Sequence, residues 1–529
     1  MKTALPVIAG MAVFFCSAGS LSAITHDNDA IAVIYNLNDP SAKALADFYC
    51  SARGIDSSRE IPVAAPRKEE ITREEYDDLI ARPVRDAFIR RGYWLVTLDM
   101  MNRPILYAST IRYVALIRGI PLKIRQCANY PGDSKDQPDP YGGCNAASVD
   151  SELSLLGYFT PQISGNIQNP LYHENYEPLS EAKIPQGMLF VSRLDAPTDD
   201  AVRKMILNGI RAEHEGLWGW GYIDLRSLNQ QGYARGDRWI REAGEAMRRN
   251  GIPVLSDDLP ETLQEGFPVT DAAAYYGLYA ADINGPFATP GFSFIPGAVA
   301  VHLHSYSATT LHDSSKGWTG PLVAHGASAS VGNVYEPYLP FTTDLGVFAT
   351  ALLSGRNLAE SYYSAQPVLS WMSICVGDPL FRPYGAWYSE VPSSHEAQSL
   401  WSDYRNMILS HGGNVLAAAA DLKSRAEEKK ESLYLEALGA AQLDSGDLVH
   451  AEESFREASV FTKDPAISFR LLLEQARSLE KQGRGRTVVG LLQNGLQRFG
   501  DTEQQGLLHS WIRRMDSPEV SASPIKNNP

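Results

Sequence analysis

Three stretches of this chain decide its fold: PGAVAVHLHSYSATTL (296–311), GPLVAHGASASVGNVYEP (320–337) and VGDPLFRP (376–383). The first two contain runs of small and β-branched residues, which are typical of strands buried in a sheet. The third is a tight turn around an Asp-Pro pair. Ligands of α/β sheets bind beyond the carboxyl ends of the strands. The polar residues from His302 onward are therefore predicted to line a pocket.

Outside these stretches, strand-like runs alternate with amphipathic segments. We expect further strands at residues 31–36, 61–64, 113–118, 188–192, 221–224 and 272–280, and helices at residues 41–53, 73–91, 199–214, 236–250 and 343–353. Continuous apolar strands alternating with helices predict an α/β domain with a largely parallel sheet and helices on both faces. We place this domain at residues 24–390, with a division into two subdomains near residue 185.

The composition changes at residue 398, where strand signals end and Ala, Leu, Glu and Gln become frequent. One 34-residue unit has the large, small, turn and aromatic positions of a tetratricopeptide repeat, at Leu435, Leu438, Gly439, Gly446, Ala451, Phe455 and Ala458. Flanking units match less well, at Trp401, Tyr404, Ile408, Gly412 and Ala417 before it and at Ala476, Gly483, Val488 and Leu492 after it. We predict a tetratricopeptide-like module over 398–515 that docks a protein partner, with a generic helical cap as the alternative. A disordered tail is expected over 516–529.

The first 23 residues read as a secretory signal peptide, with Lys2 ahead of an apolar run that ends near Cys16 and small residues before Ala23. The alternative is an uncleaved anchor, which needs a longer apolar run. We therefore expect export from a bacterial cytoplasm to the periplasm or the extracellular space, without stable membrane insertion after cleavage.

The chain is acidic, with a formal net charge of −15 and no long run of Lys or Arg. A nucleic-acid groove needs clustered positive charge, as does attraction to an anionic membrane surface. The overall charge therefore argues against both kinds of partner, and no nucleic acid is expected.

Loss of the signal peptide would leave four of the five cysteines, an even number in an oxidising compartment. Cys127 and Cys144 flank a loop rich in Pro, Gly and Asp, and we predict a disulfide between them. Cys50 and Cys375 lie in apolar surroundings, so we interpret them as buried thiols.

Two histidines and a serine are the candidate catalytic residues. On an extended strand His302 and His304 point to the same face, where they would hold a divalent metal if carboxylates converge on them. The alternative is a pair of structural, hydrogen-bonded histidines. Ser305 follows at the end of the strand, but neighbours on a strand point to opposite faces. His304 would therefore not activate Ser305 directly.

Two polar clusters are candidates for binding. Asp150 and Glu152 follow the loop that ends at Cys144, and Asn333 with Glu336 closes the strand over 327–334. Either pair would orient a histidine or bind a cation. Asp150 has the alternative role of capping the helix that begins there.

The order of these strands, followed by the GDP turn and an arginine, resembles the carboxyl-terminal half of the gingipain-type cysteine peptidases of the caspase-like fold. In that family a His-Gly pair ends one strand and a catalytic Cys ends the next. The His-Gly position falls here in Tyr276-Gly277-Leu278, and the Cys position falls at or near Ser305. The resemblance therefore implies a caspase-like domain that lacks both catalytic residues.

A wider resemblance covers residues 31–384. The motifs RYVALIRGIPL, ASVDSELSLL, GLWGWGYID, HLHSYSATTL, GNVYEPYLP and VGDPLFRP occur in order and are similar to those of an exported bacterial family without an assigned function. This resemblance implies export and the fold, but no mechanism.

Two functions remain open at this point. The first is a ligand- or protein-binding scaffold on a degenerate caspase-like domain. The alternative is a peptidase- or esterase-type hydrolase that uses His302 or His304 with Ser305 or a bound metal. No cofactor is predicted unless these histidines hold a divalent metal.

Overall fold

The computed structural model describes residues 27–127, 144–159, 165–172, 184–227, 231–388, 398–500 and 502–516. The predicted signal peptide lies outside these residues. So do nearly all of the predicted tail and the loop between Cys127 and Cys144.

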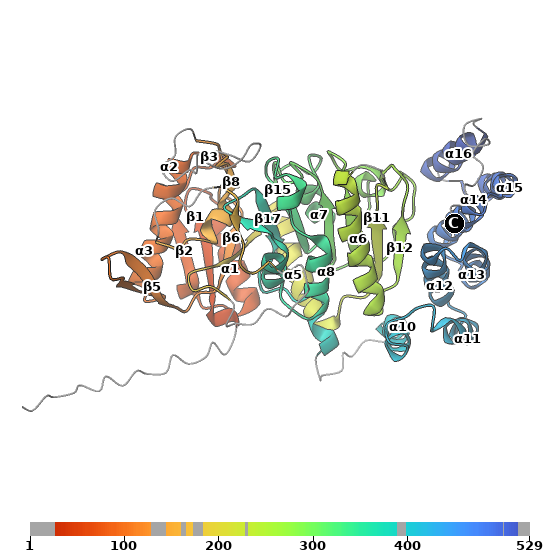
Figure 1. Ribbon diagram of the computed structural model, residues 1–529, viewed down its shortest axis with the longest axis horizontal. Coiled ribbons are helices and arrows are strands. Elements are labelled where there is room, and N and C mark those ends of the chain that lie inside the picture. The colour runs from red at the N-terminus through yellow and green to blue at the C-terminus, as the bar shows by residue number, and fades with distance from the viewer. Residues whose placement is uncertain are drawn as a thin grey trace, which may run out of the picture.

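A ten-stranded sheet forms the centre of the molecule (Figure 1). Its strands lie in the order β12 (Val254–Asp257), β11 (Trp220–Asp224), β13 (Ala272–Leu278), β14 (Val299–Leu303), β15 (Ala329–Asn333), β17 (Ser373–Gly377), β10 (Phe190–Leu194), β6 (Tyr113–Ile117), β1 (Ile31–Asn36) and β2 (Glu60–Val63). Pairing is parallel among β11–β15 and again among β10, β6, β1 and β2. Strands β15 and β17 are antiparallel. The predicted largely parallel α/β sheet is thus confirmed.

The segments that follow strands of both groups meet at one edge of the sheet. Lys123, a few residues after β6, donates a hydrogen bond to the carbonyl of Thr309, which follows β14. His312, in the same loop as Thr309, contacts Asp195 directly after β10. This edge is where an α/β sheet presents its ligand sites.

Strands β1, β6, β13 and β14 are buried on both sides, because helices cover both faces of the sheet. One face packs against helices α1 (Ala42–Arg53), α5 (Asp199–Glu215), α6 (Gln231–Arg249), α8 (Leu345–Leu353) and α9 (Leu358–Ala365) in one continuous apolar core. The other face has two cores. One includes α2 (Arg73–Tyr76), a π-helical turn (Asp77–Ala81), α3 (Arg82–Arg90) and α4 (Val149–Leu153), and the other includes α7 (Thr319–Ala324) and the carboxyl-terminal helices. The predicted domain boundaries stay predictions.

Several short strands and helices lie outside the main sheet. One small sheet contains β3 (Glu70–Ile71), β7 (Lys123–Ile124) and β8 (Ala147–Ser148). A second is the hairpin of β4 (Trp94–Leu98) and β5 (Pro104–Ser109). A third pairs β9 (Ile167–Gln168) with β16 (Val368–Leu369). The 3-10 helices are η1 (Asp27–Asp29), η2 (Ser57–Arg59), η5 (Gly285–Ala288), η6 (Leu339–Phe341) and η7 (Gly385–Tyr388).

The carboxyl-terminal part is a run of helices, as predicted: α10 (Gln398–Ser410), α11 (Ala419–Lys429), α12 (Leu433–Ser445), α13 (Leu448–Phe461), α14 (Pro465–Lys481), α15 (Gly485–Arg498) and α16 (Thr502–Asp516). A Cβ on Gly439 would lie 2.9 Å from the ring of Phe455, so a small residue is needed where α12 and α13 meet. The predicted register of the first unit is wrong by one residue. Ala417 is exposed and Ala418 is fully buried, because the turn after Gly412 shifts the helix.

These helices pack against the β12 side of the sheet through buried charges (Figure 1). The Arg470 guanidinium pairs with Glu436 at 2.6 Å, and both side chains are buried. Arg470 also donates hydrogen bonds to the hydroxyls of Tyr222 and Thr270 at the sheet. Removing one partner would leave a buried charge uncompensated, so this network fixes the helices to the sheet.

In the parts of the chain that the structure describes, no helix is long and apolar enough to span a bilayer.

Candidate functional site

A pocket of about 290 Å³ lies at the carboxyl ends of β13, β14 and β15. It is lined by Tyr233, Leu278, Tyr279, Leu303, His304, Ser305, Glu336, Pro337, Tyr338, Leu339 and Thr342. Three of the predicted site residues, His304, Ser305 and Glu336, therefore come together in one cavity. The other lining residues are mostly apolar or aromatic, as in many small-molecule sites.

Three tyrosines with left-handed backbone follow the three strands. Tyr279 comes directly after β13 with φ of 68°, Tyr306 follows β14 with φ of 60°, and Tyr338 follows β15 with φ of 62°. A positive φ is rare for bulky residues and is found mainly where the surrounding structure maintains it, often at functional sites. Two of them, Tyr279 and Tyr338, line the pocket. The turns after β13 and β15 thus place aromatic side chains in the pocket wall.

Aromatic rings form part of the pocket wall. The rings of Tyr233, from α6, and Tyr279 lie edge to face with centroids 4.5 Å apart. The Tyr279 ring also meets the His304 imidazole edge to face at 5.0 Å. Such pairs prefer this geometry and fix the rings relative to one another.

Glu336 is the only anionic side chain among the lining residues. One of its oxygens, Oε1, accepts a hydrogen bond from the backbone N–H of Tyr338 at 3.2 Å. The neighbouring His304 imidazole is half-buried, and its burial lowers the pKa below the usual value. His304 donates from Nδ1 to the carbonyl of Ser305. A neutral His304 leaves Nε2 as the acceptor of the ring. Glu336 then gives the lining of the pocket its formal negative charge.

His302 is fully buried and acts in a different way from His304. Its ring stacks on Trp318 with centroids 3.7 Å apart. The backbone N–H of Ala280 donates to Nε2 at 2.9 Å, so Nδ1 carries the proton and donates to the Tyr275 hydroxyl at 2.8 Å. Burial lowers the pKa of His302 well below its usual value, which keeps the ring neutral.

A buried chain of hydrogen bonds continues from this histidine. The Tyr275 hydroxyl donates to Oδ2 of Asp224, at the end of β11, at 2.9 Å. Burial, together with the nearby Asp257 charge, raises the pKa of Asp224 to about 8. The chain from Asp224 through Tyr275 and His302 ends on Ala280, the residue after the strained Tyr279. We interpret it as the support that holds the Tyr279 turn in place.

The predicted pair of histidine ligands for a metal does not form. His302 uses both ring nitrogens in hydrogen bonds, because the Ala280 N–H and the Tyr275 hydroxyl lie against them. Among the described residues, no group of three or more His, Cys, Asp or Glu side chains is arranged to hold a metal ion. Only His304 and Glu336 remain as potential ligands in the pocket.

The predicted nucleophile position holds a hydroxyl. Ser305 lies two residues beyond β14, beside the end of β13, which is where the resemblance places the catalytic cysteine. None of the lining residues is a cysteine. Cys50 and Cys375 are buried elsewhere, as predicted, and burial raises the pKa of each thiol to about 12. Thiols of this kind are poor nucleophiles.

Asn333 positions the strand end and does not line the pocket. Its Nδ2 donates to the carbonyl of His304 at 3.1 Å, and its Oδ1 accepts from the Ser373 hydroxyl at 2.8 Å. The side chain therefore links the ends of β14 and β15 to β17.

Asp150 and Glu152 are not pocket residues, so their predicted binding role is not supported. Each is buried and neutralised by an arginine: Asp150 pairs with Arg193, and Glu152 with Arg73 at 2.8 Å. Asp150 does not cap the helix either, since the hydroxyl of Ser148 accepts from the third residue of α4. The sequence could not reveal these arginines, which lie far away along the chain.

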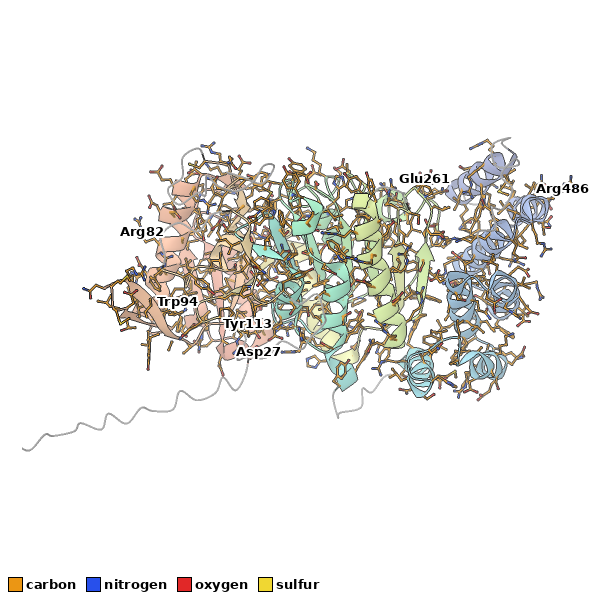
Figure 2. All side chains as sticks on the ribbon, in the orientation of Figure 1. Asp27, Arg82, Trp94, Tyr113, Glu261 and Arg486 are labelled. Atoms are coloured by element: carbon orange, nitrogen blue, oxygen red, sulfur yellow. The ribbon has the colours of Figure 1, made fainter. Side chains whose placement is uncertain are left out.

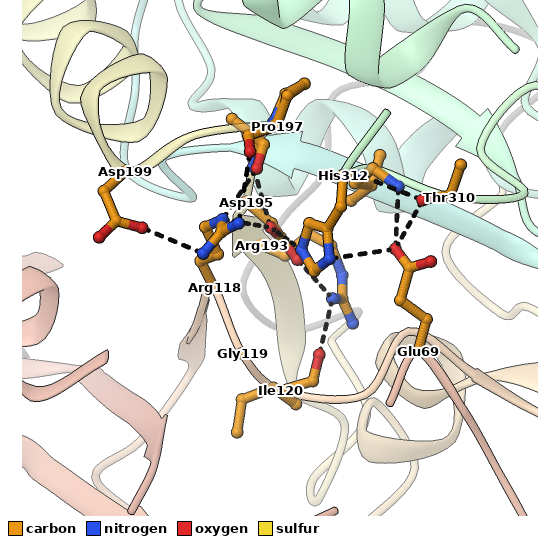
Figure 3. Close-up of polar contacts among 12 residues, drawn as sticks. Glu69, Arg118, Gly119, Ile120, Arg193, Asp195, Pro197, Asp199, Thr310 and His312 are labelled. Atoms are coloured by element: carbon orange, nitrogen blue, oxygen red, sulfur yellow. Dashed lines mark hydrogen bonds and ion pairs between the residues drawn. The ribbon is translucent and has the colours of Figure 1, made fainter. Parts of the chain in front are cut away.

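A second polar cluster lies at the same edge of the sheet, around Asp195 (Figure 3). His312 donates from Nε2 to Oδ1 of Asp195 at 3.0 Å, and its Nδ1 lies 3.5 Å from Glu69. Arg193 donates to Oδ2 of Asp195 at 3.3 Å, and the Arg118 guanidinium lies 3.9 Å from Oδ1. Burial opposes protonation of His312, but the hydrogen bond and the charge of Asp195 raise its pKa overall. Every ring nitrogen and carboxylate here thus has a charged neighbour.

Cys127 and Cys144 are both partly buried at the base of the loop they flank. The Asn145 amide ties this base together, because it accepts from the N–H of Cys127 and donates to its carbonyl, both at 2.8 Å. The predicted disulfide stays a prediction.

Sequence reasoning missed Tyr233, Tyr279 and Tyr338. The sequence pattern did not mark them, since Tyr279 lies inside the strand predicted over 272–280 and Tyr338 lies four residues beyond the strand predicted over 327–334. Their positive φ angles are visible only in three dimensions.

No protein-family model matches the chain, and no curated protein matches its sequence. A search of solved structures finds similarity to a chain described as "Structure of Protease", with a TM-score of 0.34 and 9% sequence identity. The similarity covers 70% of this chain and 83% of that chain.

Proposed function

We propose that this protein is a binding protein on a degenerate caspase-like domain, and that its pocket accepts a ligand with a cationic group. The observation that carries the proposal is the pocket itself. It combines tyrosine rings with the carboxylate of Glu336, and no cysteine lines it. A ring face attracts a cation, and a carboxylate in a partly buried site strengthens that preference.

The electrostatics of the lining support a cation over an anion. Glu336 carries the only formal charge, because the lowered pKa of His304 keeps that imidazole neutral near pH 7. The chain as a whole has a formal net charge of −15, which would raise the local concentration of a cationic ligand. An anionic ligand would meet repulsion from both sources.

The rigidity of the walls supports binding as well. Tyr279 and Tyr338 have strained backbone, and the buried chain from Asp224 to His302 ends on the residue after Tyr279. A wall held in its bound geometry loses little entropy when a ligand enters. We infer that the strain is maintained because it presents the rings to the ligand.

The carboxyl-terminal helices complete the proposal as a tetratricopeptide-like docking module in an exported protein. Arg470 and Glu436 use the sheet-facing side of α12 and α14 within the chain. A protein partner would therefore dock on the side of these helices that faces away from the sheet. Export to the periplasm or the extracellular space rests on the amino-terminal sequence.

A hydrolase is the second candidate, because His304 and Ser305 both line the pocket. His304 donates its Nδ1 proton to the backbone carbonyl of Ser305, an arrangement that does not itself activate the hydroxyl. A fluorophosphonate probe tests this candidate. A covalent adduct at Ser305 that is lost in His304→Ala would favour the hydrolase over the binding protein.

The binding proposal is tested by titration calorimetry with methylamine, guanidinium and choline. We expect binding of at least one cation and none of dimethylbutanol, the uncharged carbon isostere of choline. Glu336→Gln should weaken binding about tenfold or more, as loss of a hydrogen bond or ion pair to a charged group predicts. Glu261→Gln is the matched control, because it removes an exposed carboxylate that does not line the pocket, and it should leave binding unchanged. Binding that is unaffected by Glu336→Gln would contradict the proposal.

A further inference from the structure

The hairpin of β4 and β5 carries an apolar surface that nothing in the described molecule covers. Its inward side chains, Trp94 and Leu106, are buried in the core beneath β1 and β6. The outward face and the turn expose large apolar side chains: Leu95, Leu98, Met100, Met101, Ile105 and Tyr107. The relative exposure of Met101 is 74%, and Met100 is fully exposed. Soluble proteins rarely expose a ribbon of this kind without a partner.

The turn that presents the two methionines is well defined. Oδ1 of Asp99 accepts from the backbone N–H groups of Met101 and Arg103 at 2.8 and 2.9 Å. The Arg103 guanidinium pairs with the same carboxylate at 2.8 Å. The charges at the tip thus cancel, and the apolar side chains point outward from a fixed turn. The hairpin lies at the end of the molecule opposite to the helical repeats (Figure 1).

The segment around the hairpin is basic although the chain is acidic. Residues 82–112 contain six arginines and two aspartates and no Lys or Glu, in a chain with a net charge of −15. Two of these arginines are paired, Arg82 with Asp78 and Arg103 with Asp99. Arg91 and Arg85 donate to backbone carbonyls, of Glu60 and Leu156 respectively, which leaves their charges uncompensated. Arg90 is exposed at the end of α3, directly before the hairpin. Arg82 and Trp94 are labelled at this end in Figure 2.

We propose that this hairpin attaches the protein peripherally to an anionic lipid surface. The two exposed methionines and the apolar face would enter the interface between head groups and acyl chains, while the nearby arginines attract anionic head groups. Flexible methionine side chains suit a fluid layer, which offers no fixed complementary shape. The overall charge argued against such a surface, but it averages over this local excess of arginine.

A second copy of the chain is the main competing occupant. A two-fold interface would set the same basic segment against itself, and like charges across an interface are unfavourable. Charge complementarity therefore favours an anionic partner over a second copy.

Vesicle co-sedimentation tests the proposal, with the protein beginning at residue 24 so that the apolar amino terminus does not itself bind lipid. We expect binding to vesicles of phosphatidylcholine mixed with phosphatidylglycerol, and several-fold weaker binding to phosphatidylcholine alone or at high salt. The double variant Met100→Ser with Met101→Ser should lower the partition coefficient about tenfold or more, since two apolar side chains no longer leave water. Arg90→Gln with Arg91→Gln should lower it several-fold only on the anionic vesicles.

A matched control changes two exposed apolar residues elsewhere, Val449→Ser with Val460→Ser on α13, and should leave partitioning unchanged. The two methionines and the two valines are exposed, so thermal unfolding of the methionine and valine variants should match the parent. Absence of binding to anionic vesicles would overturn the proposal. An equal loss of vesicle partitioning in the α13 control would also overturn the proposal. Self-association without lipid that disappears in the methionine variant would assign the ribbon to a second copy instead.

Discussion

Two polar sites share the carboxyl edge of the sheet, and they differ in how completely their charges are compensated. Around Asp195, the carboxylate, His312 and Arg193 contact one another, and Arg193 also pairs with Asp150. In the pocket beyond β13–β15, Glu336 faces tyrosine rings and a neutral imidazole. The first site is saturated by its own protein groups, whereas the second has a charge without a countercharge.

The two sites also differ in backbone conformation, and the pocket is again the less relaxed of the two. Positive φ angles occur at Tyr279, Tyr306 and Tyr338, in the turns around the pocket, whereas Arg118, Arg193 and Asp195 have none. A saturated network stabilises a fold, and a strained site with an uncompensated charge is suited to a ligand. The comparison therefore supports a structural role for the charge-rich site and the proposed binding role for the charge-poor one.

The largest effect should come from Asp195→Ala. This change leaves Arg193 and His312 with one countercharge fewer in a buried site, so the free energy of unfolding should fall by about 3–5 kcal/mol. Urea denaturation measures it. Asp199→Ala is the control, because that carboxylate is part-exposed and pairs only at the rim with Arg118. Equal losses in the two variants would mean that the Asp195 cluster is not a special structural site.

The second prediction concerns His302, which supports the pocket without lining it. His302→Ala removes the stacking partner of Trp318 and leaves the Ala280 N–H and the Tyr275 hydroxyl without this partner, so we expect a loss of about 2–4 kcal/mol. His304→Ala should cost less than about 1 kcal/mol, because that side chain is only half-buried. Similar losses in both would show that the two histidines have the same role.

The third prediction uses pH to separate the sites. Because the pKa of His312 is raised in the folded protein, its contribution to stability is complete below about pH 6.5, the unfolded value. The contribution is lost as the pH rises through the folded pKa. The stability advantage of the parent over His312→Gln should therefore shrink between neutral and alkaline pH. A pH-independent difference would show that the ion pair with Asp195 does not matter.

The contribution of the buried Asp224 to stability should change over a lower pH range than the contribution of His312. Its pKa of about 8 in the folded protein lies above the unfolded value of about 3.9, so the folded state favours the neutral acid. Relative to Asp224→Asn, the parent should lose stability as the pH rises from about 4 to 8, by up to about 1.4 kcal/mol per pH unit, and change little above. Parallel pH profiles of the two proteins would contradict this account of the buried chain.

The fold was largely predictable because each strand is a short apolar run followed by turn residues, and each helix has a clear apolar face. The pocket edge was predictable for the same reason, since His304 and Ser305 lie at the end of one predicted strand and Glu336 follows the next. The roles of the individual residues were not predictable from the sequence. Asp150 and Glu152 have arginine partners 43 and 79 residues away, and only the folded chain brings them together.

His302 and His304 show the same limit at closer range. Both lie in one HLHS motif, yet one ring is enclosed by Trp318 and Tyr275 and the other lines the pocket. The alternation of side chains gave no means of separating them, because the enclosing residues come from β13 and the loop before α7.

The most direct test of the central claim is titration calorimetry of choline into the parent, Glu336→Gln and Asp195→Asn, with unfolding measured on each. We predict that Glu336→Gln weakens binding about tenfold or more while stability changes by less than about 0.5 kcal/mol. We predict the opposite for Asp195→Asn, with lower stability and unchanged affinity in the folded protein. Loss of affinity in Asp195→Asn with none in Glu336→Gln would contradict the assignment of the two sites.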